Sequence, residues 1–178
     1  MMVGPPGCGK TMLAERLAGI LPDMTSSEAL ATAAVYSVSH LGFDSRYWQR
    51  RPFRAPHHSA SAVALVGGGA RVGPGEISLA HNGVLFLDEL SEFSRQVLDQ
   101  LREPLESGSV LIARAGRTAR YPCRFQWVSA MNPCGCGYHG DRSGRCRCTV
   151  EQVRRHQSRL SGPLIDRVDL HVRLQSVD

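Results

Sequence analysis

Long apolar segments are missing from this sequence of 178 residues: no window approaches eighteen consecutive apolar residues, so we expect no membrane-spanning helix. The first ten residues, MMVGPPGCGK, also lack the apolar run of a secretory signal peptide, so we expect a cytoplasmic protein. Internal repeats and low-complexity tracts are absent as well. With 42% hydrophobic and 21% charged residues, the chain can form one packed domain, and wholesale disorder is excluded.

Lysine is nearly absent, because twenty of the twenty-one basic residues are arginine and Lys10 is the single exception. The formal net charge is +5, a mild basic excess that is compatible with nucleic-acid binding without establishing it. Six cysteines in a chain expected in the cytoplasm indicate a metal site or free thiols rather than disulfides.

The single lysine belongs to a glycine-rich turn at residues 4–11 that fits the P-loop pattern. Its glycines would let backbone N–H groups turn toward phosphate oxygens, and the following helix would offer its positive N-terminus to the same anion. Lys10 can reach the β- and γ-phosphates, and the Thr11 hydroxyl can bind Mg²⁺. A turn that only caps a helix is the alternative. The residues expected to bind ATP here are Gly4, Pro5, Pro6, Gly7, Cys8, Gly9, Lys10 and Thr11.

A second half of such a site is expected where two apolar strands end. Val84–Leu87 is typical of a strand buried on both faces, and Asp88 and Glu89 follow it directly. We expect Asp88 to bind Mg²⁺ and Glu89 to orient or deprotonate the attacking water. Asn132 follows the next apolar strand and could hydrogen-bond that water or the γ-phosphate; a turn-forming asparagine before Pro133 is the alternative.

Helical and strand patterns alternate along the chain, which predicts an α/β fold: a three-layer P-loop NTPase core with a parallel central sheet and inserted β-hairpins. Thr25 with Glu28 forms a capping box, and Thr149 with Gln152 repeats the pattern. Helices are expected at 11–20, 25–40, 94–106 and from 149; strands at 1–3, 84–87, 125–130 and 168–174; a hairpin at 110–124; a hairpin or mobile loop at 67–75; and irregular chain at 46–58 and 132–148.

Together these motifs resemble an AAA+ ATPase of the Mg-chelatase-like group, in particular the ComM/YifB family. The resemblance is carried by RPFRAPHHSAS, LVGGGARVGPGEISLAHNGVLFLDEL, PCRFQWVSAMNPCGCG and RLSGPLIDRVDLHV, which span nearly the whole chain. It implies Walker A, Walker B and sensor 1 elements, and a hexameric ring that hydrolyses ATP between subunits. For ComM-type proteins it also implies helicase or branch-migration activity on single-stranded or branched DNA.

The resemblance also implies an arginine finger. In this group the finger lies in the segment that matches 163–167, so Arg167 is expected to act on the γ-phosphate of a neighbouring subunit, with Arg159 as the alternative. Only three residues precede Gly4, and nothing after Asp178 supplies the family's helical lid. We therefore expect residues 1–178 to be an AAA+ ATPase core shortened at both ends.

Arginines on the two expected hairpins are candidates for DNA contacts. Arg114, Arg117 and Arg120 lie on a segment that resembles the pre-sensor 1 hairpin of related helicases, and it leads into the strand before sensor 1. Arg71 lies on the glycine-rich tip at 67–75, which resembles the helix-2 insert. Such arginines would bind phosphates without reading bases, whereas solvated hairpins without a ligand are the alternative.

Two C-x-C pairs follow the sensor asparagine, and four thiolates would satisfy a tetrahedral Zn²⁺ ion. We expect a structural zinc site in the loop 134–148, with free thiols or a disulfide as alternatives. His139 is a possible substitute ligand, while Cys8 and Cys123 resemble packing or loop residues. The expected zinc ligands are Cys134, Cys136, Cys146 and Cys148.

Two other functions remain open. A magnesium-chelatase ATPase subunit, which acts with partner subunits to insert Mg²⁺ into a porphyrin, shares the nucleotide chemistry. A ring ATPase that remodels protein partners would need no DNA contact, and its behaviour would not depend on DNA or salt. The cysteine cluster and the arginine-bearing hairpin favour the DNA-remodelling class.

Overall fold

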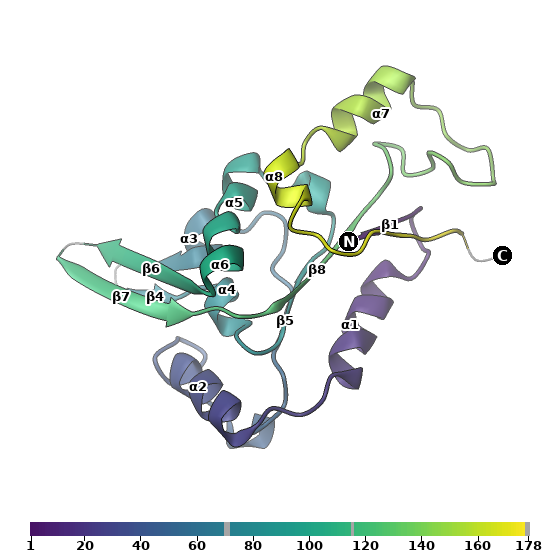
Figure 1. The fold of residues 1–178 in the computed structure, drawn as a ribbon. Coiled ribbons are helices and arrows are strands. Elements are labelled where there is room, and N and C mark those ends of the chain that lie inside the picture. Colours follow the sequence, from purple (N-terminus) through teal and green to yellow (C-terminus); the bar gives the residue numbers. More distant parts are fainter. Residues whose placement is uncertain (70–71, 115, 177–178) are drawn as a thin grey trace.

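The computed structural model describes residues 1–69, 72–114 and 116–176. Its centre is a parallel five-stranded sheet in the order β2–β5–β8–β1–β9 (Figure 1). This confirms the predicted α/β fold with a parallel central sheet. The strands are β1 (Met2–Val3), β2 (Phe53–Arg54), β5 (Val84–Leu87), β8 (Gln126–Met131) and β9 (Val172–Arg173).

Several helices begin where the sequence supplies a cap. Thr25 and Thr149 each accept a hydrogen bond from the backbone N–H three residues later, and both capping boxes are complete. Ser94 also caps the helix that follows it. None of the helices in the described ranges has both the length and the apolar character needed to cross a bilayer. The helices are α1 (Lys10–Ile20), α2 (Ser26–Ser37), α3 (Ala62–Val66), α4 (Glu76–Leu79), α5 (Arg95–Asp99), α6 (Arg102–Ser107), α7 (Val150–Gln157) and α8 (Gly162–Ile165), with 3₁₀ turns η1 (Ser45–Tyr47) and η2 (Leu90–Glu92).

Hydrophobic clusters cover both faces of the sheet. Because side chains alternate across a strand, Val84 and Phe86 of β5 join one cluster, while Leu85 and Leu87 join the other. All four side chains are buried, as expected of an inner strand of a parallel sheet. Helix α1 packs on the first face, and helices α3, α4, α5 and α8 pack on the second. The chain is therefore a three-layer sandwich, and its glycine-rich turn at residues 4–9 lies where β1 ends and α1 begins.

Two antiparallel hairpins accompany these layers. β6 (Ser109–Arg114) pairs with β7 (Arg117–Pro122) and projects away from the body of the molecule (Figure 1). β3 (Gly67–Gly68) pairs with β4 (Gly73–Pro74). The Tyr121 hydroxyl donates to the Val72 carbonyl at 2.9 Å, so the two hairpins lie side by side.

Several elements differ from the sequence predictions, among them the short helices α3, α4 and α8, which were not predicted. The expected helix 94–106 is divided into α5 and α6, because Pro104 has no N–H group with which to continue a helix from residue 100. The stretch 46–58 is not wholly irregular, since it supplies β2, which pairs with β5. The closing strand is shorter than 168–174 and comprises only Val172–Arg173.

Candidate functional site

The turn between β1 and α1 carries the predicted phosphate-binding residues. Gly7 and Gly9 adopt left-handed backbone conformations, with φ of 78° and 82°, which residues with a Cβ rarely adopt. A Cβ on Gly4 would lie 2.8 Å from the Cys8 sulfur, so close packing also requires glycine there. A Cβ on Gly7 would meet no atom within 4 Å. The turn therefore has the tight and accessible backbone that suits a phosphate group.

Lys10 is held beside this turn by backbone carbonyls. Its Nζ donates to the Gly4 and Pro5 carbonyls at 2.8 and 2.9 Å, and to Asn132 Oδ1 at 3.2 Å. Asn132 directly follows β8, the strand that neighbours β1, so the strand order brings the amide to the ammonium group. An ATP phosphate would therefore meet both groups at the same sheet edge.

The acidic end of β5 reaches the same place. Thr11 Oγ1 donates to Asp88 Oδ2 at 2.6 Å, and Asp88 Oδ1 accepts the Glu89 N–H at 2.8 Å. Hydroxyl and carboxylate oxygens are the hard ligands that Mg²⁺ takes in proteins. The Thr11–Asp88 pair therefore fits the expected magnesium site in its chemistry and in its position next to the phosphate turn.

Glu89 has a strained backbone and a histidine partner. Its φ of 50° is left-handed, a conformation that costs a residue with a side chain about 1–2 kcal/mol. Its carboxylate lies 2.9 Å from His58 Nδ1, and the His58 ring packs against His57 with 4.0 Å between ring centroids. Sequence reasoning missed this contact with Glu89. His58 follows β2, the neighbour of β5, but β2 itself was not predicted.

Another histidine contacts the backbone of Asn132. His156 of α7 is buried, and its Nε2 lies 3.0 Å from the Asn132 carbonyl. A carbonyl only accepts hydrogen bonds, so Nε2 is the donor and carries a proton. Asn132 is thus fixed through its side chain by Lys10 and through its backbone by α7. The sequence contains no local pattern that predicts the His156 contact.

The two arginine-finger candidates pair with acidic side chains of their own chain. Arg167 donates to Glu106, and Arg159 Nη1 donates to Glu92 Oε1 at 2.9 Å and to the Ser91 carbonyl at 3.0 Å. Their side chains are 46% and 51% exposed. In the described residues neither guanidinium bonds to the phosphate turn of its own chain. Exposed pairs of this kind contribute little stability, so either guanidinium can leave its carboxylate at little cost.

The DNA candidates on the β6–β7 hairpin are exposed. Arg114 lies directly opposite Arg117, and like charges in that position repel each other. No ion pair in the described part of the chain includes Arg114, Arg117 or Arg120. Arg71, the fourth candidate, lies outside the described residues.

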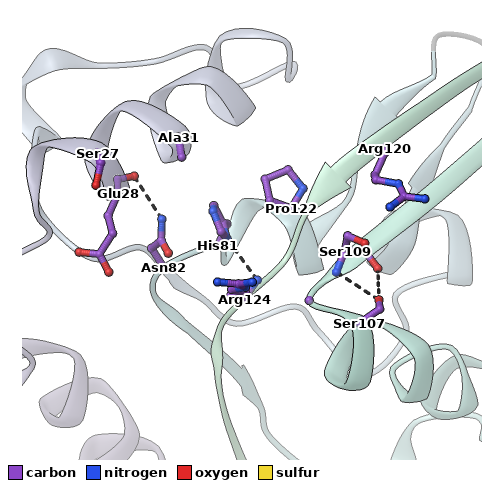
Figure 2. Close-up of a pocket in the computed structure, with 11 residues that line it drawn as sticks. Ser27, Glu28, Ala31, His81, Asn82, Ser107, Ser109, Arg120, Pro122 and Arg124 are labelled. Carbon is purple, nitrogen blue, oxygen red and sulfur yellow. Dashed lines mark hydrogen bonds between the residues drawn. The ribbon is translucent and has the colours of Figure 1, made fainter.

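A separate hollow of about 550 Å³ opens between α2 and the base of this hairpin (Figure 2). Arg120 and Arg124 line it together with Glu28 and His81. Burial lowers the pKa of His81, and its Nδ1 accepts the Arg124 N–H at 3.1 Å, so this imidazole is neutral. None of the residues that line the hollow belongs to the phosphate turn.

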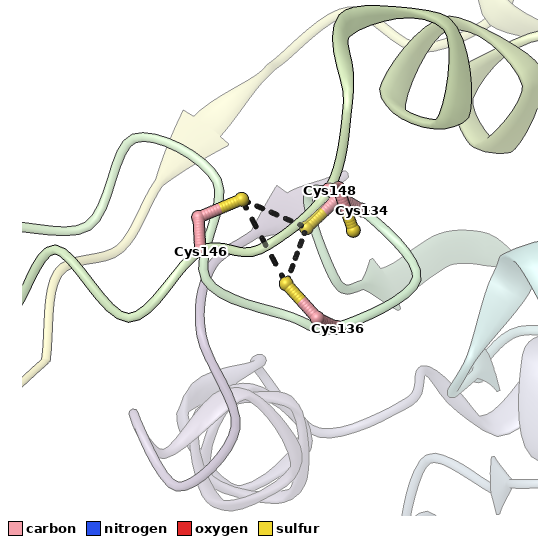
Figure 3. Close-up of side chains that lie close together, drawn as sticks. All are labelled: Cys134, Cys136, Cys146 and Cys148. Atoms are coloured by element: carbon pink, nitrogen blue, oxygen red, sulfur yellow. Dashed lines mark hydrogen bonds between the residues drawn. The ribbon is translucent and has the colours of Figure 1, made fainter.

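The four cysteines of the 134–148 loop converge, and their sulfur atoms all lie within 4.8 Å of one another (Figure 3). Cys134 Sγ is 3.4 Å from that of Cys136 and 3.9 Å from that of Cys146, while the last two are 3.7 Å apart. Tetrahedral Zn²⁺ with Zn–S bonds of about 2.3 Å separates its sulfurs by about 3.8 Å. The fourth sulfur is that of Cys148. The cluster therefore has the size and composition of a four-thiolate zinc site.

The cysteines differ in their tendency to ionise. All six cysteines of the chain are free. Backbone N–H groups of Arg147 and Tyr138 lower the pKa of Cys136 to about 6, whereas desolvation and the neighbouring cysteine sulfurs raise the pKa of Cys146, and raise that of Cys148 to about 11. His139 is exposed and is not a member of the cluster. Cys123 is buried, and burial raises its pKa to about 12.

Comparison with known proteins places the chain in a family. A family model described as magnesium chelatase, subunit ChlI, matches residues 1–178. The chain is 55% identical over 175 residues to the Escherichia coli K12 protein named uncharacterized protein YifB, covering 98% of this chain and 34% of that protein. It is also 55% identical over 172 residues to competence protein ComM of Haemophilus influenzae, covering 97% of this chain and 33% of that protein.

A more distant relative is the magnesium-chelatase 38 kDa subunit of Acidiphilium rubrum, which is 33% identical over 70 residues, 39% of this chain and 20% of that protein. The chain spans about a third of the length of the YifB and ComM proteins that it matches. The family match covers every residue, and the parallel sheet with its phosphate turn is consistent with it. The chain therefore belongs to the magnesium-chelatase-like AAA+ family, in the group that contains ComM and YifB.

Proposed function

We propose that the chain is the ATP-hydrolysing core of a ring-forming DNA motor of the ComM type. The observation that carries this proposal is the convergence of two pairs: Thr11 with Asp88 at 2.6 Å, and Lys10 with Asn132 at 3.2 Å. Their side chains come from three distant parts of the sequence and meet through the strand order β5–β8–β1. A phosphate turn, a magnesium ligand pair and an amide at one sheet edge are the groups that phosphoryl transfer to water requires.

Each of these residues has a distinct role in the proposal. The backbone of residues 4–11 and the N-terminus of α1 bind the phosphates, and Lys10 neutralises charge on them. Thr11 and Asp88 would hold Mg²⁺, which supplies Lewis-acid polarisation of the phosphoryl oxygens when bound. Glu89 orients the attacking water or accepts its proton, and Asn132 aligns the water or the γ-phosphate.

Hydrolysis is proposed to take place between subunits of a homo-oligomeric ring, a hexamer as the family resemblance implies. Arg167 would reach the γ-phosphate of the neighbouring subunit and stabilise the charge that develops in the transition state. Its half-exposed position supports this role, because a weak pair with Glu106 is readily exchanged for a stronger anion. Arg159 is the second candidate.

DNA is the proposed partner of the β6–β7 hairpin. Exposed guanidinium groups without an acidic partner in the described residues suit the phosphate backbone of single-stranded or branched DNA. The name of the Haemophilus relative, a competence protein, agrees with a role on DNA. The four-cysteine cluster is the proposed site of a structural Zn²⁺ ion, on the basis of its thiolate donor set and sulfur spacing.

A magnesium-chelatase ATPase subunit is the second candidate function, and the description of the matching family model favours it. It would use the same nucleotide site, but partner subunits and a porphyrin would stimulate hydrolysis instead of DNA. The match to the Acidiphilium subunit covers only 39% of this chain, whereas the ComM and YifB matches cover nearly all of it. This difference in coverage supports the DNA motor.

ATP hydrolysis per subunit, measured over a range of protein concentrations with and without single-stranded DNA, tests the proposal. We expect the rate to rise with concentration and with DNA, and Glu89→Gln to lower kcat by about 10²–10⁴-fold while nucleotide still binds. Glu151→Gln is the matched control, since that side chain is 85% exposed on α7, where it pairs with Arg155.

ATP hydrolysis by Glu89→Gln at the parental rate would refute the proposed catalytic site. The role of Arg167 across the subunit boundary would be refuted by an ATP hydrolysis rate per subunit that does not rise with assembly. It would also be refuted if Arg167→Ala hydrolysed ATP at the parental rate. Stimulation by porphyrin and partner subunits, with none by DNA, would favour the chelatase function.

A further inference from the structure

The loop that carries the four cysteines packs directly on the phosphate turn. A Cβ on Gly137 would lie 2.8 Å from Cδ and 2.9 Å from Cγ of Pro6, so the Gly137 backbone already touches that ring. Gly137 is buried and left-handed, with φ of 88°. Its N–H donates to the Cys134 carbonyl at 2.9 Å. One of the expected metal ligands is therefore bonded to the residue that supports the phosphate turn.

The same loop begins at the nucleotide site. Asn132, its first residue, accepts a hydrogen bond from Lys10 through its side chain and one from His156 through its backbone. Five residues later Gly137 lies against Pro6. The first arm of the loop thus touches the phosphate turn at two points, one polar and one apolar.

Besides the cysteine cluster, the middle of this loop is held by local turn hydrogen bonds around Asp141 and by a cation–π contact of Arg145 with the Tyr138 ring. Residues 132–149 form no helix or strand, and Gly140 and Gly144 adopt left-handed conformations in open surroundings. An irregular, glycine-rich loop loses much conformational entropy when it is held in one shape. Polar contacts at its far end are exposed, such as the 2.7 Å bond from Ser176 Oγ to Asp141 Oδ1.

The cysteines join the two arms of the loop. Cys134 and Cys136 lie on the arm that touches Pro6, whereas Cys146 and Cys148 lie on the arm that leads into α7. A metal ion bound by all four would close the loop and restrict both arms at once. Restriction of the first arm also restricts the phosphate turn, because the Gly137–Pro6 contact leaves no room between them.

We propose that Zn²⁺ bound by these four cysteines holds the loop 132–149 against Pro6 and thereby raises the affinity of the phosphate turn for ATP. The inference rests on the proposed nucleotide site and adds a metal-dependent support to it. With the metal bound, the turn and Asn132 are already in position, so ATP binding does not have to order them. Without the metal, the loop gains conformational freedom and ATP binding must restrict it.

Metal removal is the first test. Zinc content of untagged protein is measured by mass spectrometry, and the Kd for a fluorescent ATP analogue is measured before and after a zinc-selective chelator, with Mg²⁺ in excess and a reductant present. We expect about one Zn²⁺ per chain, and an ATP affinity at least about fivefold weaker after its removal, the lower end of ordinary coupling between two sites. Added Zn²⁺ restores the affinity.

A pair of glycine variants tests the contact without touching a metal ligand. Gly137→Ala and Gly140→Ala both place an alanine at a left-handed position of the same loop, with φ of 88° and 77°. Only the first introduces a Cβ that collides with Pro6, because a Cβ on Gly140 meets no atom within 4 Å. We expect Gly137→Ala to keep its zinc and lose ATP affinity, and Gly140→Ala to keep both.

Each failure is distinguishable. A parent protein that holds zinc but binds no ATP refutes the nucleotide site and with it this inference. ATP binding that is unchanged by zinc removal, or equal in the two glycine variants, refutes the coupling and leaves the nucleotide site standing. Less than half an equivalent of zinc after mild purification refutes the metal site itself.

Discussion

DNA contact by the β6–β7 hairpin is tested by replacing Arg114, Arg117 and Arg120 with alanine. All three are exposed, and no ion pair in the described residues neutralises them. A phosphate bound between Arg114 and Arg117 would relieve their repulsion. The substitutions are expected to weaken DNA binding while the hairpin keeps its fold, because exposed changes away from special contacts cost within about 0.5 kcal/mol each.

Counterion release sets the expected magnitude. Each phosphate contact on a single strand adds about 0.7 to the slope of log affinity against log salt concentration, so the loss of three contacts lowers that slope by about 2. Over a fourfold increase in salt, the parent then loses about twentyfold more affinity than the triple variant loses. The comparison of slopes separates phosphate contacts from a general loss of stability, which would not change the salt dependence in this way.

Fluorescence anisotropy of a labelled single strand, measured between about 50 and 200 mM salt, gives both slopes. The matched control removes the same charge elsewhere, with alanine at Arg16, Arg95 and Arg155, which are exposed on α1, α5 and α7. We expect the control to keep nearly the parental slope. Equal slopes for the parent and the hairpin variant would refute the DNA contact.

Two further predictions concern reactivity and stability. With a pKa of about 12, roughly one Cys123 thiol in ten thousand is ionised at pH 8. Cys123 of the native protein should therefore resist alkylation by iodoacetamide, and it should react only at higher pH or after denaturant is added. Peptide mass spectrometry measures the extent of alkylation. Gly83→Ala should lower the free energy of unfolding by about 3 kcal/mol or more, because its Cβ would lie 2.0 Å from the Pro52 carbonyl oxygen and would separate β2 from β5. Gly19→Ala, inside α1 and in open space, should instead stabilise by about 0.5–1 kcal/mol, and urea denaturation of both variants measures the contrast.

The features that the sequence predicts well depend on neighbouring residues. The capping boxes at Thr25 and Thr149 involve residues three positions apart, and the hairpin 110–124 follows from two short segments that flank Ala115-Gly116 in the sequence. Strand 84–87 follows from an uninterrupted apolar run. The phosphate turn is likewise a contiguous motif. Capping, turn formation and strand burial depend on residues that are close in the sequence, so a single sequence is enough to predict them.

The features that the sequence does not predict come from distant residues. His58 meets Glu89, and His156 meets Asn132, only because the sheet and α7 bring separate segments together. The left-handed backbone of Glu89 is also invisible, since glutamate has no preference for that conformation. The two-residue strand β2 lacks a run of alternating side chains, and pairing with β5 alone defines it.

The hairpin and the proposed nucleotide site are connected by two neighbouring inner strands of the sheet, β5 and β8. The Arg124 backbone, at the base of the hairpin, accepts the Asn82 N–H at 2.6 Å and donates to His81 Nδ1, just before β5 begins. The same segment continues directly into β8. Both strands therefore start at the hairpin base and end at the groups expected to act on ATP, Asp88 at the end of β5 and Asn132 at the end of β8.

β5 and β8 are also paired with each other from Val84–Gln126 to Leu87–Ser129, and their inner side chains are buried in close packing. A packed and hydrogen-bonded strand pair resists internal deformation, so a displacement of the hairpin base would move both strand ends together. DNA binding at the hairpin would then act on the magnesium ligand and the sensor amide at once. On this basis the triple arginine variant should lose DNA stimulation of ATP hydrolysis while it keeps the basal rate. Full stimulation in that variant would show that DNA acts through another surface.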